Sequence, residues 1–129
     1  MKINAIDHFV LTTNNLQACL DFYSNVLGME VICENGRYAL RFGGQKINIH
    51  TKVAEFLPAA KNPQVGALDI CLVGDEPIEK VRGELLAKGV NLETEIVERN
   101  GALGNMRSIY LRDPDGNLIE IADYQNKDA

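Results

Sequence analysis

At 129 residues, the chain is long enough for one domain with a substantial core and too short for two large independent domains. Its net charge of -5 and its pI near 5.0 argue against a nucleic-acid partner, because such proteins present a basic face to phosphates. No apolar run is long enough to span a bilayer and the start MKINAIDH lacks a secretory leader, so we expect a cytoplasmic protein with no membrane partner. The scattered cysteines Cys19, Cys33 and Cys71 fit reduced thiols better than a disulfide framework.

The first half of the chain is predicted to form one strand, one helix and three further strands. In AIDHFVL, residues 5–11, alternation puts His8 on one strand face and Phe9 on the other. Apolar residues at helical spacing predict a helix over residues 15–28, with Gly28 as its end. Short strands separated by NG and GG turns follow at residues 29–34, 37–43 and 45–51.

The second half repeats this order. A strand at residues 66–74 precedes a helix at 76–90, whose buried side is predicted to carry Ile78, Val81, Leu85 and Leu86. Three strands are then predicted, at residues 91–98, 108–114 and 117–124. We interpret the chain as a single domain made by tandem duplication, with unit one at residues 4–54, a connector at 55–65 and unit two at 66–125.

The predicted fold class is α+β, in which tandem β-α-β-β-β units form a curved, open mixed sheet around a cleft. One such unit leaves a sheet face uncovered, so pairing two of them is expected to enclose that cleft. Polar residues fall on the first and last strands of both units: His8 and His50 in unit one, Asp69 and Glu120 in unit two. Two imidazoles and two carboxylates meeting there would suit a divalent ion such as Zn, Ni, Co, Mn or Fe.

Each of these residues also has an ordinary structural explanation. A single strand histidine is most often hydrogen-bonded or half exposed, and the two carboxylates could be outward-facing residues of alternating strands. The coincidence across the two repeats favours a site, because polar groups facing a closed core need solvent or a cation. The chain's only two histidines both fall on these strands.

The chain resembles the vicinal oxygen chelate superfamily, also called the glyoxalase/bleomycin-resistance/dioxygenase superfamily. The resemblance is carried by IDHFVL, LDFYSNVLGMEV, QKINIH, LDICL, GALG and SIYLRDPDGNLIEI, and it extends from about Ile6 to Tyr124. The chain is similar in particular to small glyoxalase-domain-containing proteins. Some bacterial members of that group carry a virulence-associated label.

The resemblance implies a metal held by His8, His50 and Glu120, with Asp69 at a fourth position. Lactoylglutathione lyases typically have a glutamate where this chain has His50, and a histidine or glutamine where it has Asp69. Ring-cleaving dioxygenases use two histidines and a glutamate, with both histidines on first strands, so His50 departs from that pattern as well. Asp69 is then a direct ligand, a water-mediated one, or a residue that orients another ligand.

The implied function is a glyoxalase-like, lactoylglutathione lyase-like metalloenzyme that chelates a substrate with adjacent oxygens and moves a proton. Glu120 is the first candidate for the general base and Asp69 the second. The alternatives are a ring-cleaving dioxygenase, a thiol transferase, or a non-catalytic binding or resistance protein; with no tryptophan for stacking, the chain favours an enzyme. The relatives imply a homodimer and a small-molecule substrate.

Other positions have more ordinary interpretations. The DPDGN stretch at residues 113–117 predicts a turn before the last strand. The glycine-rich stretch ERNGALGNMRS predicts a mobile lip, with Arg107 either solvated or available to an anionic substrate. Tyr110 is in phase with Ser108 and either lines the cleft or fills core, and Cys71 is expected to be buried.

Overall fold

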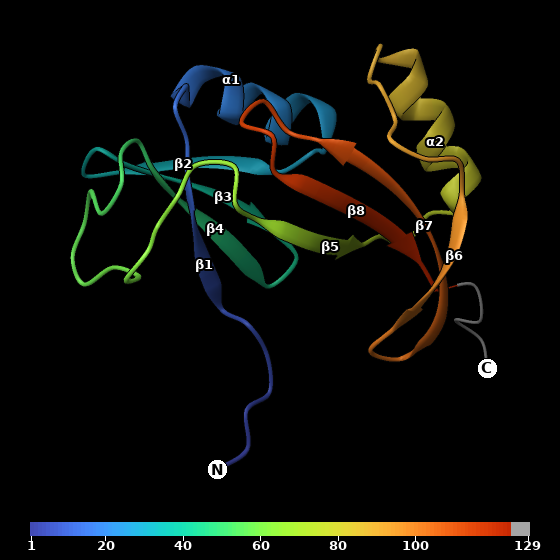
Figure 1. The fold of residues 1–129 in the computed structure, drawn as a ribbon, viewed down its shortest axis with the longest axis horizontal. Coiled ribbons are helices and arrows are strands. Elements are labelled where there is room, and N and C mark those ends of the chain that lie inside the picture. Colours follow the sequence, from blue (N-terminus) through green and yellow to red (C-terminus); the bar gives the residue numbers. More distant parts are fainter. Residues whose placement is uncertain (125–129) are drawn as a thin grey trace. The chain divides into compact units, whose positions relative to one another are not determined.

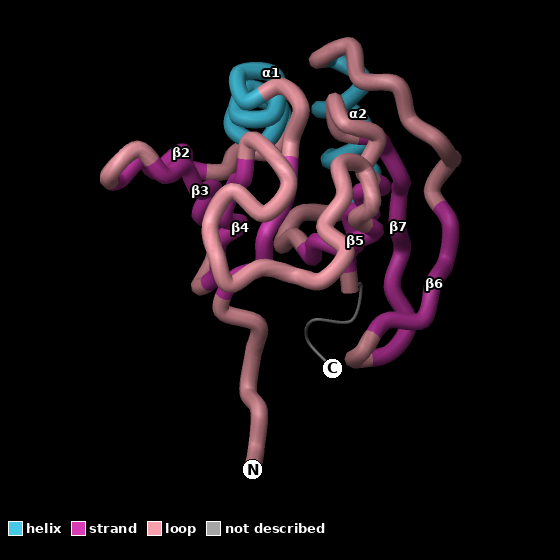
Figure 2. The backbone as a smooth tube through the Cα atoms, turned by 60° about the vertical axis from the view of Figure 1, so that its left-hand side comes forward, coloured by secondary structure: helices cyan, strands magenta, loops and turns pink. Residues whose placement is uncertain are grey.

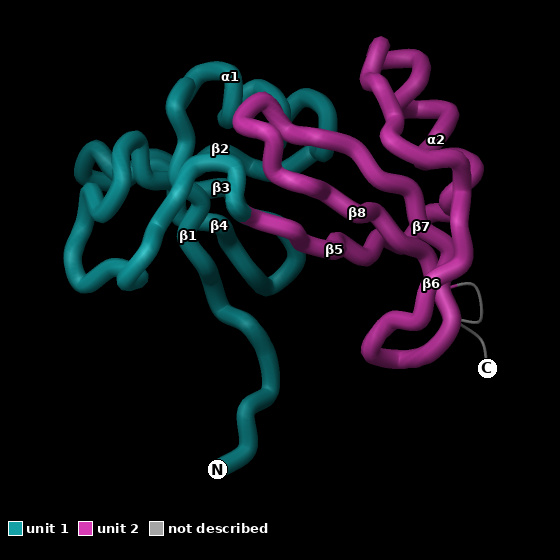
Figure 3. Tube along the Cα trace, viewed as in Figure 1, with its two compact units in different colours: residues 1–67 teal, residues 68–129 magenta. Residues whose placement is uncertain are grey.

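The computed structural model describes residues 1–124 and divides the chain into two compact units (Figure 3). Unit 1 is Met1–Ala67 and unit 2 begins at Leu68. Each unit holds a four-stranded mixed sheet built in the order strand, helix and three strands (Figure 1). The predicted pair of β-α-β-β-β units is thereby confirmed. Within residues 1–124, no helix is long and apolar enough to cross a membrane.

The strands of unit 1 lie in the order β1-β4-β3-β2, with β1 parallel to β4 and the other pairs antiparallel. The bounds of its elements are β1 His8–Thr12, α1 Leu16–Asp21, η1 Phe22–Val26, β2 Glu30–Glu34, β3 Arg37–Phe42 and β4 Gln45–His50. The buried side chains come from one strand face and from the helix; they include Leu11, Leu40, Ile47, Cys19 and Tyr23. His8, Asn48 and His50 alternate with these residues and belong to the other face.

The helix of unit 1 changes its winding in the middle. Asn15 begins it, since its side-chain oxygen accepts the backbone N–H of Ala18 at 3.1 Å. After Asp21 the chain continues as the π-helix η1, closed by the Leu27 N–H donating to the Phe22 carbonyl at 3.2 Å. The helix predicted over residues 15–28 is therefore present, and its second half has wider turns than α-helical spacing predicts.

Unit 2 repeats the arrangement with the strand order β5-β8-β7-β6 (Figure 1). Strands β6 and β7 lie side by side in Figure 2. The bounds of its elements are β5 Asp69–Val73, α2 Ile78–Ala87, β6 Val97–Gly101, β7 Gly104–Arg112 and β8 Leu118–Asp123. Strand β5 is parallel to β8, and the other pairs are antiparallel. The core includes Ile78, Leu85, Ile109 and Ile119, whereas Leu86, predicted on the buried side of the helix, is exposed.

The second strand of the second half was predicted too early, and the predicted lip is a hairpin. Strand β6 occupies residues 97–101 instead of 91–98; before it, Leu92 makes an isolated bridge to Leu111. Strands β6 and β7 are joined directly after Gly101, where any Cβ would collide with the hydroxyl of Tyr124. That hydroxyl accepts the Leu103 N–H at 3.1 Å and closes the turn. The lack of a side chain at Gly101 allows this close approach.

Candidate metal and ligand sites

His8, the first residue of β1, and Asp69, the first residue of β5, occupy equivalent positions in the two units. In unit 1, His8 lies opposite Lys46 of the parallel strand β4. In unit 2, Asp69 lies opposite Leu118 of the parallel strand β8. The predicted match between His8 and Asp69 is therefore confirmed.

The last strands do not match in the way that the sequence predicted. On β8, Glu120 lies two residues after Leu118, the residue that pairs with Asp69. On β4, the residue two positions after Lys46, which pairs with His8, is Asn48. Asn48 is therefore the equivalent of Glu120. His50 instead corresponds to Ala122. The His50 carbonyl accepts the N–H of Thr13, just after β1, at 2.8 Å, and the Ala122 carbonyl accepts the N–H of Gly74, just after β5, at 3.0 Å. The predicted equivalence of His50 and Glu120 is wrong. Asn48 is the residue that the sequence reasoning missed, although it shares a strand face with His50.

The register also separates the two histidines of unit 1. Thr12 lies opposite His50, so His8 is four residues away along the strand direction. At about 3.3 Å per residue, this offset is about 13 Å. Asp69 and Glu120 are offset by two residues on neighbouring strands, about 7 Å along the strand direction. Unit 2 thus brings its two carboxylates to one region, whereas unit 1 keeps its imidazoles apart.

His8 is an exposed imidazole with a carboxylate on one of its nitrogens. Its Nδ1 lies 2.8 Å from Oδ1 of Asp7, and nearly half of its side chain is exposed. A carboxylate bonded to one ring nitrogen fixes the tautomer and orients the other nitrogen, as is common for histidines that bind metals. The Nε2 atom of His8 is therefore the one suited to a ligand.

His50 is buried and lies beside a cavity of unit 1. Its ring packs edge-on against Phe56, with the ring centroids 5.3 Å apart. The cavity has a volume of about 480 Å³, and its lining includes Arg37, Lys46 and Asn48 as well as these two rings. His50 thus contributes to a small-molecule-sized space within one unit.

Glu120 is held by a neighbouring strand. Its Oε2 accepts the hydroxyl of Ser108 at 2.6 Å, and Tyr110 lies directly opposite it on β7. The Nε–H of Arg99 donates a hydrogen bond to the hydroxyl oxygen of Tyr110 at 3.0 Å. The predicted phase of Ser108 and Tyr110 is confirmed, and both flank the carboxylate.

Cys71 lies opposite Glu120 on β5, on the same sheet face as Asp69. The expectation that this residue is buried is wrong, because the residue is exposed. Partial burial of the thiol, together with the hydrogen bond to Glu120 and the negative charges of Glu120 and Asp69, raises the pKa of Cys71 to about 11. Acidic side chains therefore dominate the electrostatics of this face.

We expect Cys71 to react slowly with iodoacetamide at neutral pH, because the raised pKa keeps the thiol protonated. Its alkylation rate, followed by peptide mass spectrometry from pH 7 to 12, should have a midpoint at about 11. Glu120→Gln should lower that midpoint by removing a negative charge. In urea the midpoint should return to about 8.5. A wild-type midpoint that equals the one in urea would contradict this electrostatic account.

Arg107 faces away from the carboxylates. Its guanidinium pairs with both carboxylate oxygens of Glu79 on α2, at 2.6 and 2.5 Å, and this pair lowers the pKa of Glu79. On β7 it alternates with Ser108, which bonds to Glu120 on the opposite face. Arg107 therefore lies on the sheet face opposite Glu120, and the expectation that it meets an anionic substrate stays a prediction.

The DPDGN turn connects the start of β8 to the start of β5. The Asp113 carboxylate accepts the Asn117 N–H at 2.9 Å and its side-chain N–H₂ at 2.8 Å. The Asn117 side-chain oxygen accepts the Leu68 N–H at 2.8 Å. Leu68 directly precedes Asp69, so this predicted turn has a structural role that sets where Asp69 lies relative to Glu120.

We expect Asn117→Ala to lower the free energy of unfolding by about 1–3 kcal/mol, because it removes the hydrogen bonds that the buried Asn117 side chain makes to the Asp113 carboxylate and the Leu68 N–H. Urea denaturation followed by circular dichroism measures this change. Asn105→Ala, an exposed position on β7, is the matched control and should change stability by less than about 0.5 kcal/mol. Equal stability of the two variants would show that the turn does not anchor β5.

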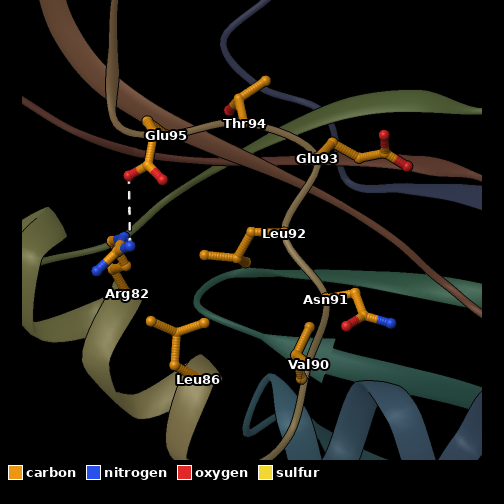
Figure 4. A pocket seen from close by; sticks show the side chains of 8 residues that line it. All are labelled: Arg82, Leu86, Val90, Asn91, Leu92, Glu93, Thr94 and Glu95. Carbon is orange, nitrogen blue, oxygen red and sulfur yellow. Dashed lines mark ion pairs between the residues drawn. The ribbon is translucent and has the colours of Figure 1, made fainter.

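A second cavity, of about 430 Å³, lies between α2 and residues 90–95 of unit 2 (Figure 4). The Arg82 guanidinium and the Glu95 carboxylate form an ion pair at 3.3 Å along its edge. None of the four predicted site residues lines it.

The donor groups fit a divalent ion by their chemistry. His8 supplies an imidazole oriented by a carboxylate, and Asp69 and Glu120 supply two carboxylates on one face of unit 2. No three His, Cys, Asp or Glu side chains of residues 1–124 lie together as a metal-binding group. The predicted four-residue site and its cleft stay predictions.

The sequence matches known proteins along nearly its whole length. Residues 5–121 match the model of the Glyoxalase/Bleomycin resistance protein/Dioxygenase superfamily. The chain is 46% identical to Virulence protein STM3117 of Salmonella typhimurium, over 96% of this chain and 87% of that protein. It is 42% identical to Glyoxalase domain-containing protein RDO1 of Mycosarcoma maydis, over 98% of this chain and 72% of that protein. It is 32% identical to Biphenyl-2,3-diol 1,2-dioxygenase 3 of Rhodococcus globerulus, over 88% of this chain and 60% of that protein.

Solved structures support the same relationship. The crystal structure of STM3117 superposes with a TM-score of 0.93, covering 96% of this chain and 99% of that one. A lactoylglutathione lyase from Agrobacterium tumefaciens superposes with a TM-score of 0.75 at 22% identity, covering 95% of this chain and 96% of that one. The second likeness concerns the fold alone.

Proposed function

The chain belongs to the Glyoxalase/Bleomycin resistance protein/Dioxygenase superfamily, and we propose that it is a metal-dependent enzyme of the glyoxalase-like type. The proposed reaction is a proton-transfer isomerisation or lyase step on a small substrate with adjacent oxygens. The observation that carries this proposal is the pair Asp69 and Glu120, which lie on one face of neighbouring strands, with Glu120 held by Ser108.

We propose that the ion, which is Ni, Zn, Mn, Co or Fe(II), is bound by His8, Asp69 and Glu120. The offset of about 13 Å along the strand direction between His8 and His50 keeps His50 out of a site that contains His8. When bound, such an ion polarises a substrate carbonyl and lowers the pKa of a neighbouring C–H group. Neutral imidazoles and ionised carboxylates are the donor groups that these ions accept.

Glu120 acts as the general base in this proposal. Ser108 occupies its Oε2, so Oε1 takes a proton from a substrate carbon and returns it to the adjacent carbon. No proton or electron is left over in such an isomerisation. Arg99 donates to the Tyr110 oxygen, which leaves the phenolic O–H to donate to a substrate oxygen on this face. Asp69 is the second candidate for the base.

Turnover measurements test this proposal. The metal-loaded protein is assayed with 2-oxoaldehyde hemithioacetals and with epimerisable acyl thioesters, before and after chelator treatment. We expect turnover of at least one substrate class that is lost with chelator and restored by adding the ion. Metal-loaded protein that turns over neither class would contradict the glyoxalase-like assignment.

A second candidate function is ring-cleaving dioxygenation, which the similarity to Biphenyl-2,3-diol 1,2-dioxygenase 3 favours. The chain spans 60% of that protein, so the comparison concerns one part of it. Consumption of oxygen with a catechol and Fe(II) would support this candidate. A thiol transferase or a non-catalytic binding protein would show neither this activity nor isomerisation.

We further propose that the enzyme is a cytoplasmic homodimer, in keeping with the sequence prediction. Size-exclusion chromatography with light scattering gives the mass in solution. A mass of about twice 14.3 kDa supports the dimer, and a mass of 14.3 kDa contradicts it.

A further inference from the structure

The cavity of unit 1 is a candidate binding site that the proposed catalytic residues of unit 2 do not account for. It has a volume of about 480 Å³, within the usual range for small-molecule sites, and lies on the polar face of the sheet. Three of its lining residues, Lys46, Asn48 and His50, alternate along β4, so that strand presents polar groups to it.

One wall of this cavity is held in place by the loop after β4. The Glu55 carboxylate accepts the Thr51 N–H at 2.7 Å and the Thr51 hydroxyl at 2.9 Å. The first of these bonds lowers the pKa of Glu55, so the carboxylate that closes the loop stays charged. The next residue, Phe56, packs edge-on against His50 and contributes to the lining.

Arg37 stacks on this wall in a way that leaves its donors available. Its Cζ lies 4.0 Å from the centre of the Phe56 ring, which makes a cation–π contact. The N–H groups lie in the plane of the guanidinium and suit a carboxylate or phosphate, which they can bind in a bidentate manner.

The two cations of the cavity are not neutralised by ion pairs. Neither Arg37 nor Lys46 forms a salt bridge with any residue among 1–124, whereas Arg41 on the same strand as Arg37 is paired with Glu30. One carboxylate, that of Glu34, also lines the cavity. Two cations against one carboxylate leave a net positive charge in a chain whose total is -5.

We propose that this cavity binds a small acid through its carboxylate or phosphate group, with Arg37 and Lys46 supplying the charge. Asn48 donates its side-chain N–H₂ to the same ligand. His50 lies beside this space, so the identification of the bound acid as the substrate rests on the proposed function. The substrate class would then be small acids that carry an anionic group besides the adjacent oxygens.

Titration of metal-free protein with inorganic phosphate and with lactate, followed by NMR of backbone amides, tests this inference without relying on the ion. We expect saturable shifts around Arg37 and Asn48 with at least one anion. Arg37→Gln and Lys46→Gln should each weaken binding about tenfold or more, because each removes a charged donor. Arg41→Gln is the matched control and should leave binding unchanged.

Comparing the two anions shows whether the cavity prefers phosphate or carboxylate. The absence of saturable shifts with both anions, or equal affinities in wild type, Arg37→Gln and Lys46→Gln, would overturn the inference. Metal content measured on the same variants separates the two proposals. Protein that binds anions through Arg37 and holds no divalent ion would refute the metal function and leave the anion site standing.

Discussion

Glu120→Gln is expected to reduce turnover by about 100-fold or more, because glutamine cannot accept the substrate proton. The substitution keeps the shape of the side chain and an oxygen that can accept the Ser108 hydroxyl, so the sheet should stay intact. Steady-state kinetics with the substrate found by screening measures the loss. Circular dichroism confirms that the fold is retained.

Glu93→Gln is the matched control for this experiment. Glu93 is also in unit 2, but its carboxylate pairs with Arg112 at 3.0 Å and is partly exposed. We expect wild-type turnover in that variant. Wild-type turnover in Glu120→Gln as well would rule out Glu120 as the base and leave Asp69 as the candidate.

His8→Ala is expected to abolish retention of the divalent ion without affecting the fold. The side chain is nearly half exposed, so its removal should change stability by less than about 0.5 kcal/mol. Asp7→Asn should give a graded effect, a 10- to 100-fold weaker metal affinity, which is about the cost of losing the carboxylate that orients a metal-binding histidine. Competition with a coloured chelator measures both affinities.

Asp21→Asn is the control for Asp7→Asn, because its carboxylate accepts a side-chain N–H of Gln17 and lies away from both histidines in the sequence. It should bind the ion as the wild type does. If His8→Ala retained the ion with unchanged affinity, His8 would be a surface histidine with an ordinary hydrogen bond to Asp7.

The sequence predicted which strand face the candidate residues share, and it did not predict their register. Alternation assigns His8, Asn48 and His50 to one face of unit 1, as the structure confirms. Because Asn48 and His50 are two residues apart, both satisfy that periodicity equally well. The pairing with β1 decides which of them corresponds to Glu120, and this pairing depends on contacts between segments far apart in the sequence.

The order of helices and strands was also predictable from local sequence patterns. The start of β6 and the π-helical winding of η1 were not. Turn glycines and alternating apolar residues mark most of the strands in both units. The stretch at residues 91–98 alternates like a strand, but β6 begins at Val97 because its partner β7 extends back to Gly104. The switch from α1 to the π-helix η1 keeps a nearly helical spacing of apolar residues, so periodicity alone does not distinguish it.

Elemental analysis of protein purified without chelator tests the central claim most directly. The account predicts about one divalent ion per chain in the wild type and loss of that ion in His8→Ala and Glu120→Ala. Protein that holds no ion, and takes none up when Ni, Zn, Mn, Co or Fe(II) is added, would contradict the metal-dependent function.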